Sequence, residues 1–189
     1  MGGYDFSMTI IGLNGYAGSG KDAVAAYLVE HHDFARVAFA DPIKKILYDM
    51  NPFIILDGED VYTLQELVDR DGWDETKSIP GVRDLLQRLG VAAREHIYED
   101  VWIDVAFEKI KDASRCVVTD CRFINEVDMI SDLNGGIVRV MRPGVVAFNA
   151  HVSEKNLDEY QEDASIWNDG SHDDLGTKIE EMLLQLDIL

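Results

Sequence analysis

Short apolar runs alternate with amphipathic stretches along this chain of 189 residues. Five of the runs have the length and composition of β-strands, at Met8–Leu13, Ala35–Ala40, Arg115–Thr119, Gly136–Met141 and Ala164–Trp167. The stretches between them have helical spacing, most clearly near the C-terminus, where apolar side chains recur at Leu175, Ile179, Met182, Leu183 and Leu186. Strands that alternate with helices form parallel sheets covered on both faces. The pattern therefore predicts a three-layer α/β fold around a five-stranded, mostly parallel sheet.

A glycine-rich turn follows the first predicted strand. It reads Gly15-Tyr16-Ala17-Gly18-Ser19-Gly20-Lys21-Asp22 and leads into an amphipathic run that begins at Ala23. The spacing G-x-x-x-x-G-K between a strand and a helix is typical of a P-loop, whose backbone amides surround phosphate oxygens while the lysine adds a mobile charge. Asp22 takes the place where a Ser or Thr hydroxyl usually meets magnesium. Its carboxylate is expected either to help hold the metal or only to complement the helix dipole.

Two segments interrupt the alternation of strands and helices. Residues 41–113 form a long, mainly helical block, and residues 143–162 form a polar stretch with little periodicity. A P-loop core with a helical insertion and a lid is the architecture of small nucleotide kinases, in which closure excludes water from the transferred phosphoryl group. We therefore expect residues 1–189 to form a single kinase domain, with a monophosphate-binding insertion in the helical block and a lid-like polar segment.

Composition narrows the partners and the compartment. The chain has 17 basic and 36 acidic residues, for a net charge of −19, which argues against nucleic-acid binding and requires any anion site to be a local cluster of Arg and Lys. No apolar run is long enough to span a bilayer, and the N-terminal segment lacks the pattern of a signal peptide. Cys116 and Cys121 have the surroundings of small buried hydrophobic residues in a reducing compartment. We expect a cytoplasmic protein with no membrane partner.

The third predicted strand is followed by Asp120 and, two residues later, by Arg122. A carboxylate at the end of a strand beside a P-loop is suited to orienting magnesium, and Asp is also a common N-cap, so both interpretations stay open. Arg122 is expected at the carboxyl edge of the sheet, where ligands bind in open α/β folds and where its side chain would bridge donor and acceptor phosphates. Asn125 and Glu126 fall in the first turn of the next helix, where helix capping explains their presence as well as a role in the site does.

A polar stripe runs along the segment from Pro80 to Arg94. At about 100° per residue, Arg83, Gln87 and Arg94 lie within roughly 40° of one another, and Gly90 lies close to them. The opposite side carries apolar residues at Val82, Leu85, Leu86, Leu89 and Ala93. We interpret the stripe as a surface for the acceptor phosphate and base, with an ordinary exposed face as the alternative. Arg88 points elsewhere and is a weaker candidate.

Further candidates come from the ends of predicted strands. Asp41 either caps the helix that begins near Pro42 or handles substrate, and Lys44 is expected near the acceptor phosphate. Arg139 and Arg142 flank the entry to the lid-like segment, where an arginine would neutralise charge in transit. Asn168, with Asp169 and Gly170, forms either an adenine-side loop or a plain turn. We interpret His151–Glu154 as local loop structure, and Trp73 and Trp102 as packing residues.

Taken together, these motifs resemble those of phage-type deoxynucleoside monophosphate kinases, in the same order. They are the P-loop with its Asp, Phe39–Lys44, Leu85–Gly90, Thr119–Glu126, His151–Glu154 and Asn168–Gly170. The resemblance runs from about Ile10 to the last helix. It implies transfer of the ATP γ-phosphate to a deoxynucleoside monophosphate with magnesium, in a fold similar to adenylate kinase. It also implies the host cytoplasm as the compartment if a phage supplies the enzyme, and it is compatible with a homodimer. Related sequences often have Thr after the loop Asp, whereas this chain has Ala23, so no hydroxyl next in sequence replaces the missing one.

The resulting hypothesis gives each candidate residue a role. Lys21, Asp120 and Arg122 are expected to act in catalysis, with Asp22 and Asp120 holding Mg²⁺ directly or through water. The acceptor is expected to contact Asp41, Lys44, Arg83, Gln87, Arg94 and Arg122. ATP is expected to contact Gly15, Ala17, Gly18, Ser19, Gly20, Lys21, Asp22, Ala23 and Asn168.

Two other functions remain open from the residues. One is a P-loop kinase of another small acceptor, similar to dephospho-coenzyme A kinase, against which the stripe argues only weakly. The other is a nucleotide-binding switch without transfer activity. A GTPase-type switch would need a base-reading motif such as Asn-Lys-x-Asp, and this chain does not contain one.

Overall fold

The computed structural model describes residues 8–56, 58, 60–146 and 160–189. The chain divides into two compact units, one made of residues 1–38 and 106–189 and the other of residues 39–105. The second unit overlaps the predicted helical block, and the domain boundaries drawn from the sequence stay predictions. No helix within the described residues combines the length and apolar character that crossing a membrane requires.

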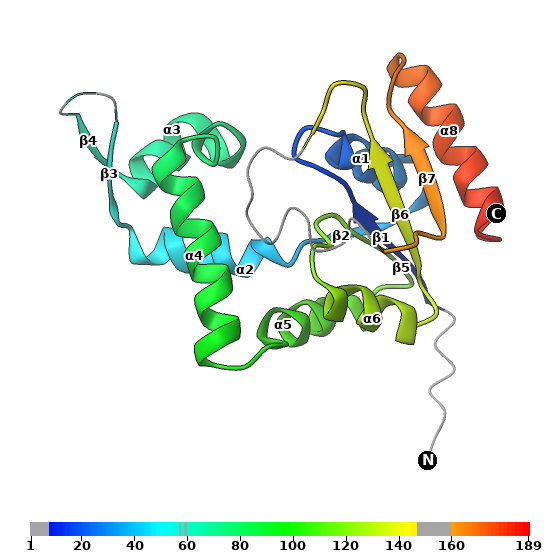
Figure 1. Cartoon of the computed structure of the whole chain (residues 1–189), viewed down its shortest axis with the longest axis horizontal. Helices are drawn as coiled ribbons and strands as arrows, with labels where there is room; N and C mark the ends of the chain where they lie inside the picture. Colours follow the sequence, from blue (N-terminus) through cyan, green and yellow to red (C-terminus); the bar gives the residue numbers. More distant parts are fainter. Residues whose placement is uncertain (1–7, 57, 59, 147–159) are drawn as a thin grey trace. The chain divides into compact units, whose positions relative to one another are not determined.

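The first unit is built on a five-stranded sheet in which every neighbouring pair is parallel (Figure 1). Its strand order is β2-β5-β1-β6-β7. The strands are β1 (Thr9–Asn14), β2 (Ala35–Val37), β5 (Arg115–Val118), β6 (Gly136–Met141) and β7 (Ala164–Trp167). All five predicted strands are therefore confirmed, with small shifts at their ends. Because the strands are parallel, all their carboxyl ends meet at one edge of the sheet.

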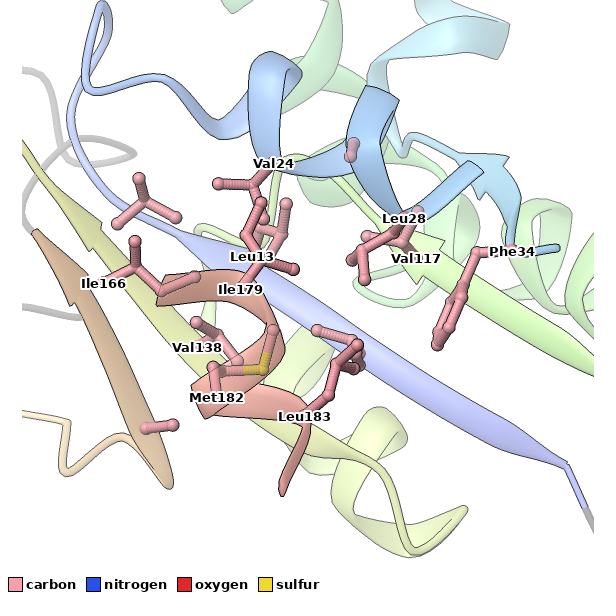
Figure 2. Packing of buried hydrophobic residues seen from close by; sticks show 14 of the residues in the cluster. Leu13, Val24, Leu28, Phe34, Val117, Val138, Ile166, Ile179, Met182 and Leu183 are labelled. Carbon is pink, nitrogen blue, oxygen red and sulfur yellow. The ribbon is translucent and has the colours of Figure 1, made fainter. Parts of the chain in front are cut away.

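Helices cover both faces of this sheet. The helices α1 (Lys21–His32) and α8 (His172–Gln185) pack on one face, where Ile11, Leu13 and Val138 form a core with their apolar side chains (Figure 2). On the other face Gly12 lies against Ile130 of α6 (Ile124–Asp132), so close that a Cβ at Gly12 would be 2.6 Å from the Ile130 Cδ1 atom. Alternation of side chains along β1 thus sends neighbouring residues to opposite layers. The predicted three-layer fold is confirmed.

One predicted strand is shorter than expected. β2 ends at Val37, and α2 (Ala40–Met50) begins at Ala40, whereas the sequence suggested a strand as far as Ala40. Val37 makes the last parallel pair, with Val118. Pro42 fits the first turn of α2, because the amides there lack helical partners in any case.

The second unit is helical with one small hairpin. It contains α2, α3 (Leu64–Thr76), α4 (Pro80–His96) and a two-stranded antiparallel sheet of β3 (Phe53–Ile55) and β4 (Val61–Thr63). α5 (Val101–Ile110) begins in this unit and ends in the first. The core of the second unit consists of Leu47, Ile54, Leu64, Leu67 and Val82. α3 is kinked at Gly72, where φ is 76° and ψ is 168°.

Candidate active site

The glycine-rich loop joins β1 to α1, as predicted. Gly15, Gly18 and Gly20 have φ values of 140°, 83° and 105°, a backbone conformation that residues other than glycine rarely adopt. Two of these positions also have no room for a side chain. A Cβ at Gly15 would lie 2.2 Å from the Val140 carbonyl oxygen, and one at Gly20 would lie 2.2 Å from Asn168 Nδ2. The loop therefore fits tightly against the ends of β6 and β7.

Lys21 is the first residue of α1, and its side chain turns back over the loop. Its Nζ donates hydrogen bonds to the carbonyl oxygens of Gly15, at 2.6 Å, and of Tyr16, at 3.0 Å. These contacts fix the ammonium group beside the loop amides. A cation in this position adds its charge to the positive end of the helix, which favours a bound phosphate.

Asn168, which follows β7, links the loop to the end of the neighbouring strand β6. Its Nδ2 donates to the Ser19 carbonyl oxygen at 3.0 Å, and its backbone amide donates to the Met141 carbonyl oxygen at 2.7 Å. The turn after β7 is held in addition by Lys178, whose Nζ donates to the Trp167 carbonyl oxygen at 2.7 Å and to Asp169. This last hydrogen bond lowers the pKa of the Asp169 carboxyl below its usual range. The turn is therefore part of the loop's scaffold.

Two polar residues of the loop differ sharply in exposure. Asp22, the second residue of α1, is exposed, whereas Ser19 is only 1% exposed. Ser19 Oγ has no hydrogen-bond partner within the described part of the chain. A buried hydroxyl left in this state costs about 1–3 kcal/mol, so the loop is suited to a ligand that supplies a partner. Ala23 is half-buried and packs against the core beneath the loop.

Asp120 and Arg122 follow β5, next to the loop-bearing strand. Thr119 N donates to the Val37 carbonyl oxygen and Cys121 N to that of Leu13, so the chain continues between β2 and β1 after β5 ends. Both residues are half-buried. The suggestion that Asp120 caps the next helix is wrong, because α6 begins only at Ile124 and its N-cap position is Phe123. Glu126 instead accepts hydrogen bonds from the amides of Arg122 and Phe123, at 2.7 and 3.0 Å.

The carboxyl ends of β6 and β7 form a pocket beside the loop. It has a volume of about 200 Å³ and is lined by Asn14, Gly15, Tyr16, Ser19, Arg139, Val140, Met141, Arg142, Val145 and Trp167. Both predicted lid arginines, Arg139 and Arg142, thus lie near the loop, while residues 147–159 of the lid-like segment, including His151–Glu154, lie outside the described residues. Sequence reasoning missed Trp167, which is 49% exposed. Its place as the last residue of a strand was the available signal.

In the second unit, α4 carries the predicted polar stripe. Arg83, Gln87 and Arg94 are half-buried, and the Nη1 atom of Arg94 is fully buried. The opposite face packs into the core through Val82, Leu85, Leu86 and Leu89, as predicted. Arg88 is exposed and lies 3.6 Å from Asp84.

Side chains from neighbouring helices contact the backbone of Gly90 on α4. Its carbonyl oxygen accepts a hydrogen bond of 2.9 Å from Trp102 Nε1, and a Cβ at this glycine would lie 3.3 Å from Ile43 Cδ1. The backbone at Gly90, next to the stripe, is thus covered by α2 and α5. Trp102 is buried and Trp73 packs against the second unit's core, which confirms both as packing residues.

Asp41 and Lys44 lie in the first turns of α2. The suggestion that Asp41 caps this helix is wrong, because the N-cap position is Phe39 and Asp41 is the second helical residue. Its carboxylate lies 3.9 Å from Lys44 Nζ, and both side chains are partly buried. The substrate-handling role of the pair stays a prediction.

The two thiols are buried and free. Burial raises the pKa of Cys116 to about 11 and that of Cys121 well above its ordinary value. Both burial and the raised pKa disfavour the reactive thiolate form at neutral pH. Cys116 and Cys121 are therefore the small buried hydrophobic residues that the sequence predicted.

Comparison with known proteins gives one consistent family. Residues 65–179 match a family model described as deoxynucleotide monophosphate kinase. The chain is similar to a protein of Acanthamoeba polyphaga mimivirus assigned to the same activity, with 32% identity over 164 residues that cover 79% of this chain and 82% of that protein. It is also similar to the deoxynucleotide monophosphate kinase of Escherichia phage RB69, with 29% identity over 108 residues that cover 54% of this chain and 44% of that protein.

Solved structures with a similar arrangement include a dephospho-CoA kinase from Campylobacter jejuni. It has a TM-score of 0.47 and 13% identity, over 95% of this chain and 98% of that one. A shikimate kinase from Aquifex aeolicus has a TM-score of 0.45 and 11% identity, over 94% of this chain and 96% of that one.

Proposed function

The chain belongs to the deoxynucleotide monophosphate kinase family, and on that premise we propose that it transfers the γ-phosphoryl group of ATP to a deoxynucleoside monophosphate. An oxygen of the acceptor phosphate forms the new bond to phosphorus, and the bond to the β-phosphate oxygen breaks, which gives ADP and a deoxynucleoside diphosphate. The observation that carries this proposal is the P-loop itself, with Lys21 Nζ fixed over its first two carbonyl groups.

Little covalent chemistry is asked of the protein. A monophosphate oxygen is already a competent nucleophile at neutral pH, so no general base is assigned. Catalysis then consists of holding the two phosphates in line and stabilising the charge of the transition state. Lys21 and Arg122 provide positive charge for this task, and both lie at the carboxyl edge of the sheet in the first unit.

The donor nucleotide is assigned to the loop and its neighbouring pocket. Residues from Gly15 to Ala23 surround the β- and γ-phosphates, and the Ser19 hydroxyl is within the loop to donate to a ligand oxygen. Asn168 and the pocket that ends at Trp167 are on the side where the base extends, and an exposed indole is a suitable stacking surface. Arg139 and Arg142 neutralise charge as the phosphoryl group passes.

Magnesium fits the residues present at this edge. Asp120 and Asp22 are the two carboxylates that would hold it, directly or through water. Mg²⁺ at sites of phosphoryl transfer is usually held by one or two carboxylates, with substrate phosphates and water as the other ligands, so two carboxylates are a sufficient contribution from the protein. When bound, the ion neutralises charge on the β- and γ-phosphates.

The acceptor is assigned to Arg83, Gln87 and Arg94 on α4, to Asp41 and Lys44 on α2, and, for its phosphate, to Arg122. Arg and Gln side chains on one helix face offer bidentate donors for phosphate and paired hydrogen bonds for a base edge. The half-burial of all three stripe residues supports this assignment over an ordinary exposed face.

A coupled assay with ATP and a panel of acceptors tests the proposal. The panel contains deoxynucleoside monophosphates, the matching ribonucleotides and dephospho-coenzyme A. We expect ADP release with at least one deoxynucleoside monophosphate and none with dephospho-coenzyme A. Turnover of dephospho-coenzyme A alone, or binding of ATP with no transfer to any acceptor, would contradict the proposed function.

The partners are small-molecule nucleotides, and we propose that nucleic acid is not among them, because 36 acidic residues outnumber 17 basic ones. We also propose the cytoplasm, or the host cytoplasm for a phage protein, as the compartment. Two buried free thiols support a reducing environment.

We propose further that two copies pair through the β3–β4 hairpin. Its surroundings present exposed apolar side chains, Met50 at 66%, Phe53 at 76%, Ile55 at 71% and Val61 at 56%. They offer roughly 500 Å² per copy, so a symmetric pair buries about 1,000 Å², the lower bound for a specific interface. An apolar patch of this size matches the largest found on typical monomers, and such patches are often functional.

The open edge of β3 is self-complementary. Leu64 N donates to the Pro52 carbonyl oxygen and Leu56 N to that of Asp60, so the backbone groups of Phe53 and Ile55 face away from β4. No strand among the described residues pairs with that edge. Two copies of β3 related by a twofold axis would pair Phe53 of each with Ile55 of the other, which satisfies these groups on both chains.

A further inference from the structure

The backbone that carries Asp120 and Arg122 is hydrogen-bonded along its length. Thr119 N donates to the Val37 carbonyl oxygen at 3.0 Å, and Cys121 N donates to the Leu13 carbonyl oxygen at 3.1 Å. The next two amides, of Arg122 and Phe123, donate to a single side-chain oxygen, Glu126 Oε2. This carboxylate therefore determines the path of the chain where the two sheet strands no longer do.

Glu126 is the one carboxylic acid among the buried residues of the described chain, with 3% exposure. Burying a carboxylate is costly unless hydrogen bonds replace its water. The hydrogen bonds from the Arg122 and Phe123 amides provide this replacement for the buried carboxylate. The Glu126 charge also acts on the neighbouring thiol of Cys121. Burial is the main cause of the raised pKa of Cys121, and the charge of Glu126 is the second.

Helix capping alone does not require a buried carboxylate. The helices α3 and α8 have acidic residues at the same third position, Glu66 and Asp174, and both are exposed. Glu66 accepts from Thr63 N at 2.7 Å and Asp174 from Ser171 N at 2.9 Å. Hydrogen bonds from Thr63 and Ser171 lower the pKa of these two carboxyls. Of the three, only Glu126 also binds the amide of a residue assigned to phosphoryl transfer.

We propose that Glu126 is a positioning residue for phosphoryl transfer. Its carboxylate holds the Arg122 amide and thereby fixes the direction in which the Arg122 side chain leaves the backbone after β5. A long arginine side chain stabilises a transition state best when its starting direction is already set, because no reorganisation is then needed. This inference rests on the proposed function, in which Arg122 contacts the transferred phosphoryl group.

Glu126→Gln tests the proposal with little change in volume. The amide oxygen is neutral and accepts more weakly than a carboxylate oxygen, so the Arg122 amide is held less firmly. We expect kcat to fall about tenfold, with an unchanged KM for ATP, since misplacement of a catalytic group lowers rate more than donor binding. The matched control is Glu66→Gln in α3, for which we expect a Tm change no larger than that of Glu126→Gln, because Glu66 is exposed, and an unchanged kcat.

Arg122→Ala, alone and combined with Glu126→Gln, separates this inference from the proposed function. We expect Glu126→Gln to have no further effect on kcat once Arg122 is Ala. Wild-type kcat in Arg122→Ala would refute the proposed role of Arg122 itself. If Arg122→Ala is impaired while Glu126→Gln has a normal kcat, only the role of Glu126 is refuted. The same holds if Glu126→Gln lowers kcat as much in the Arg122→Ala background as in the wild type.

Glu126→Asp provides the test if Glu126→Gln does not fold. It keeps the charge and shortens the reach to the two amides, so we expect a kcat between those of the wild type and Arg122→Ala at a temperature well below its Tm. A wild-type kcat in a folded Glu126→Asp variant with longer amide contacts, seen as faster hydrogen exchange at Arg122, would overturn the proposal.

Discussion

Asp22 is the residue at which the P-loop departs most from its usual form. It lies at the second position of α1, exposed, at the positive end of the helix dipole. A carboxylate beside a triphosphate repels it unless a cation lies between them. We therefore propose that Asp22 takes part in magnesium binding, and complementing the dipole is the alternative.

Asp22→Asn distinguishes these two roles. We expect the Mg²⁺ concentration for half-maximal rate to rise on the order of tenfold, because one carboxylate of a two-carboxylate site is lost. The measurement is the rate at fixed ATP over a series of free Mg²⁺ concentrations. Asp173→Asn, in the first turn of α8, is the matched control for a dipole effect. If both variants keep the wild-type Mg²⁺ dependence, Asp22 has only a helix-start role.

The structure excludes the capping alternative for both Asp120 and Asp41. Asp120 and Asp41 are good N-cap residues by type, but the helices begin elsewhere. Before α6 the chain is still held by the bond from Cys121 N to the Leu13 carbonyl oxygen, which delays the helix to Ile124. A tertiary hydrogen bond of this kind leaves no local trace in the sequence. Glu126 was correctly noted as a capping candidate, but its burial was not foreseeable.

At the scale of elements, periodicity predicted α4 well. Its polar stripe and its apolar face lie where a 3.6-residue repeat puts them: four of the predicted apolar residues pack into the core, and Ala93 is buried. The β3–β4 hairpin was missed, since strands of three residues with exposed apolar side chains give no alternation long enough to detect.

Ile55→Lys tests the proposed dimer at this hairpin. A charge on the outward-facing edge of β3 opposes strand pairing, so we expect a monomer where the wild type sediments as a dimer. Screening of the net charge of −19 should strengthen the wild-type dimer as salt is raised. Sedimentation velocity over a range of protein and salt concentrations measures both effects.

Leu184→Lys is the control for the dimer, because Leu184 is an exposed apolar residue on α8. We expect it to sediment as the wild type does. A wild-type protein that stays monomeric at high concentration and high salt would contradict the proposed pairing, as would an Ile55→Lys variant that dimerises equally well.

At the scale of the whole molecule, the order of apolar runs was sufficient to predict the sheet. The three central strands, β5, β1 and β6, are buried or half-buried along their length because helices cover both faces, whereas the edge strands β2 and β7 each expose two residues. That the strands are parallel places their carboxyl ends together, so Lys21, Asp120, Arg122 and Asn168 could be assigned to one edge in advance. The pocket beside the loop could not be predicted from the sequence, since its shape depends on side chains from three separate strands and the loop.

The central claim is that this P-loop transfers a phosphoryl group from ATP to a deoxynucleoside monophosphate. The most direct test follows the γ-phosphate of labelled ATP into the deoxynucleoside diphosphate, with the wild type and Lys21→Ala side by side. We predict labelled diphosphate with the wild type and a rate at least about 100-fold lower with Lys21→Ala, at an unchanged Tm, because the transition-state charge loses its nearest cation. Label transfer at the wild-type rate in Lys21→Ala would contradict the account.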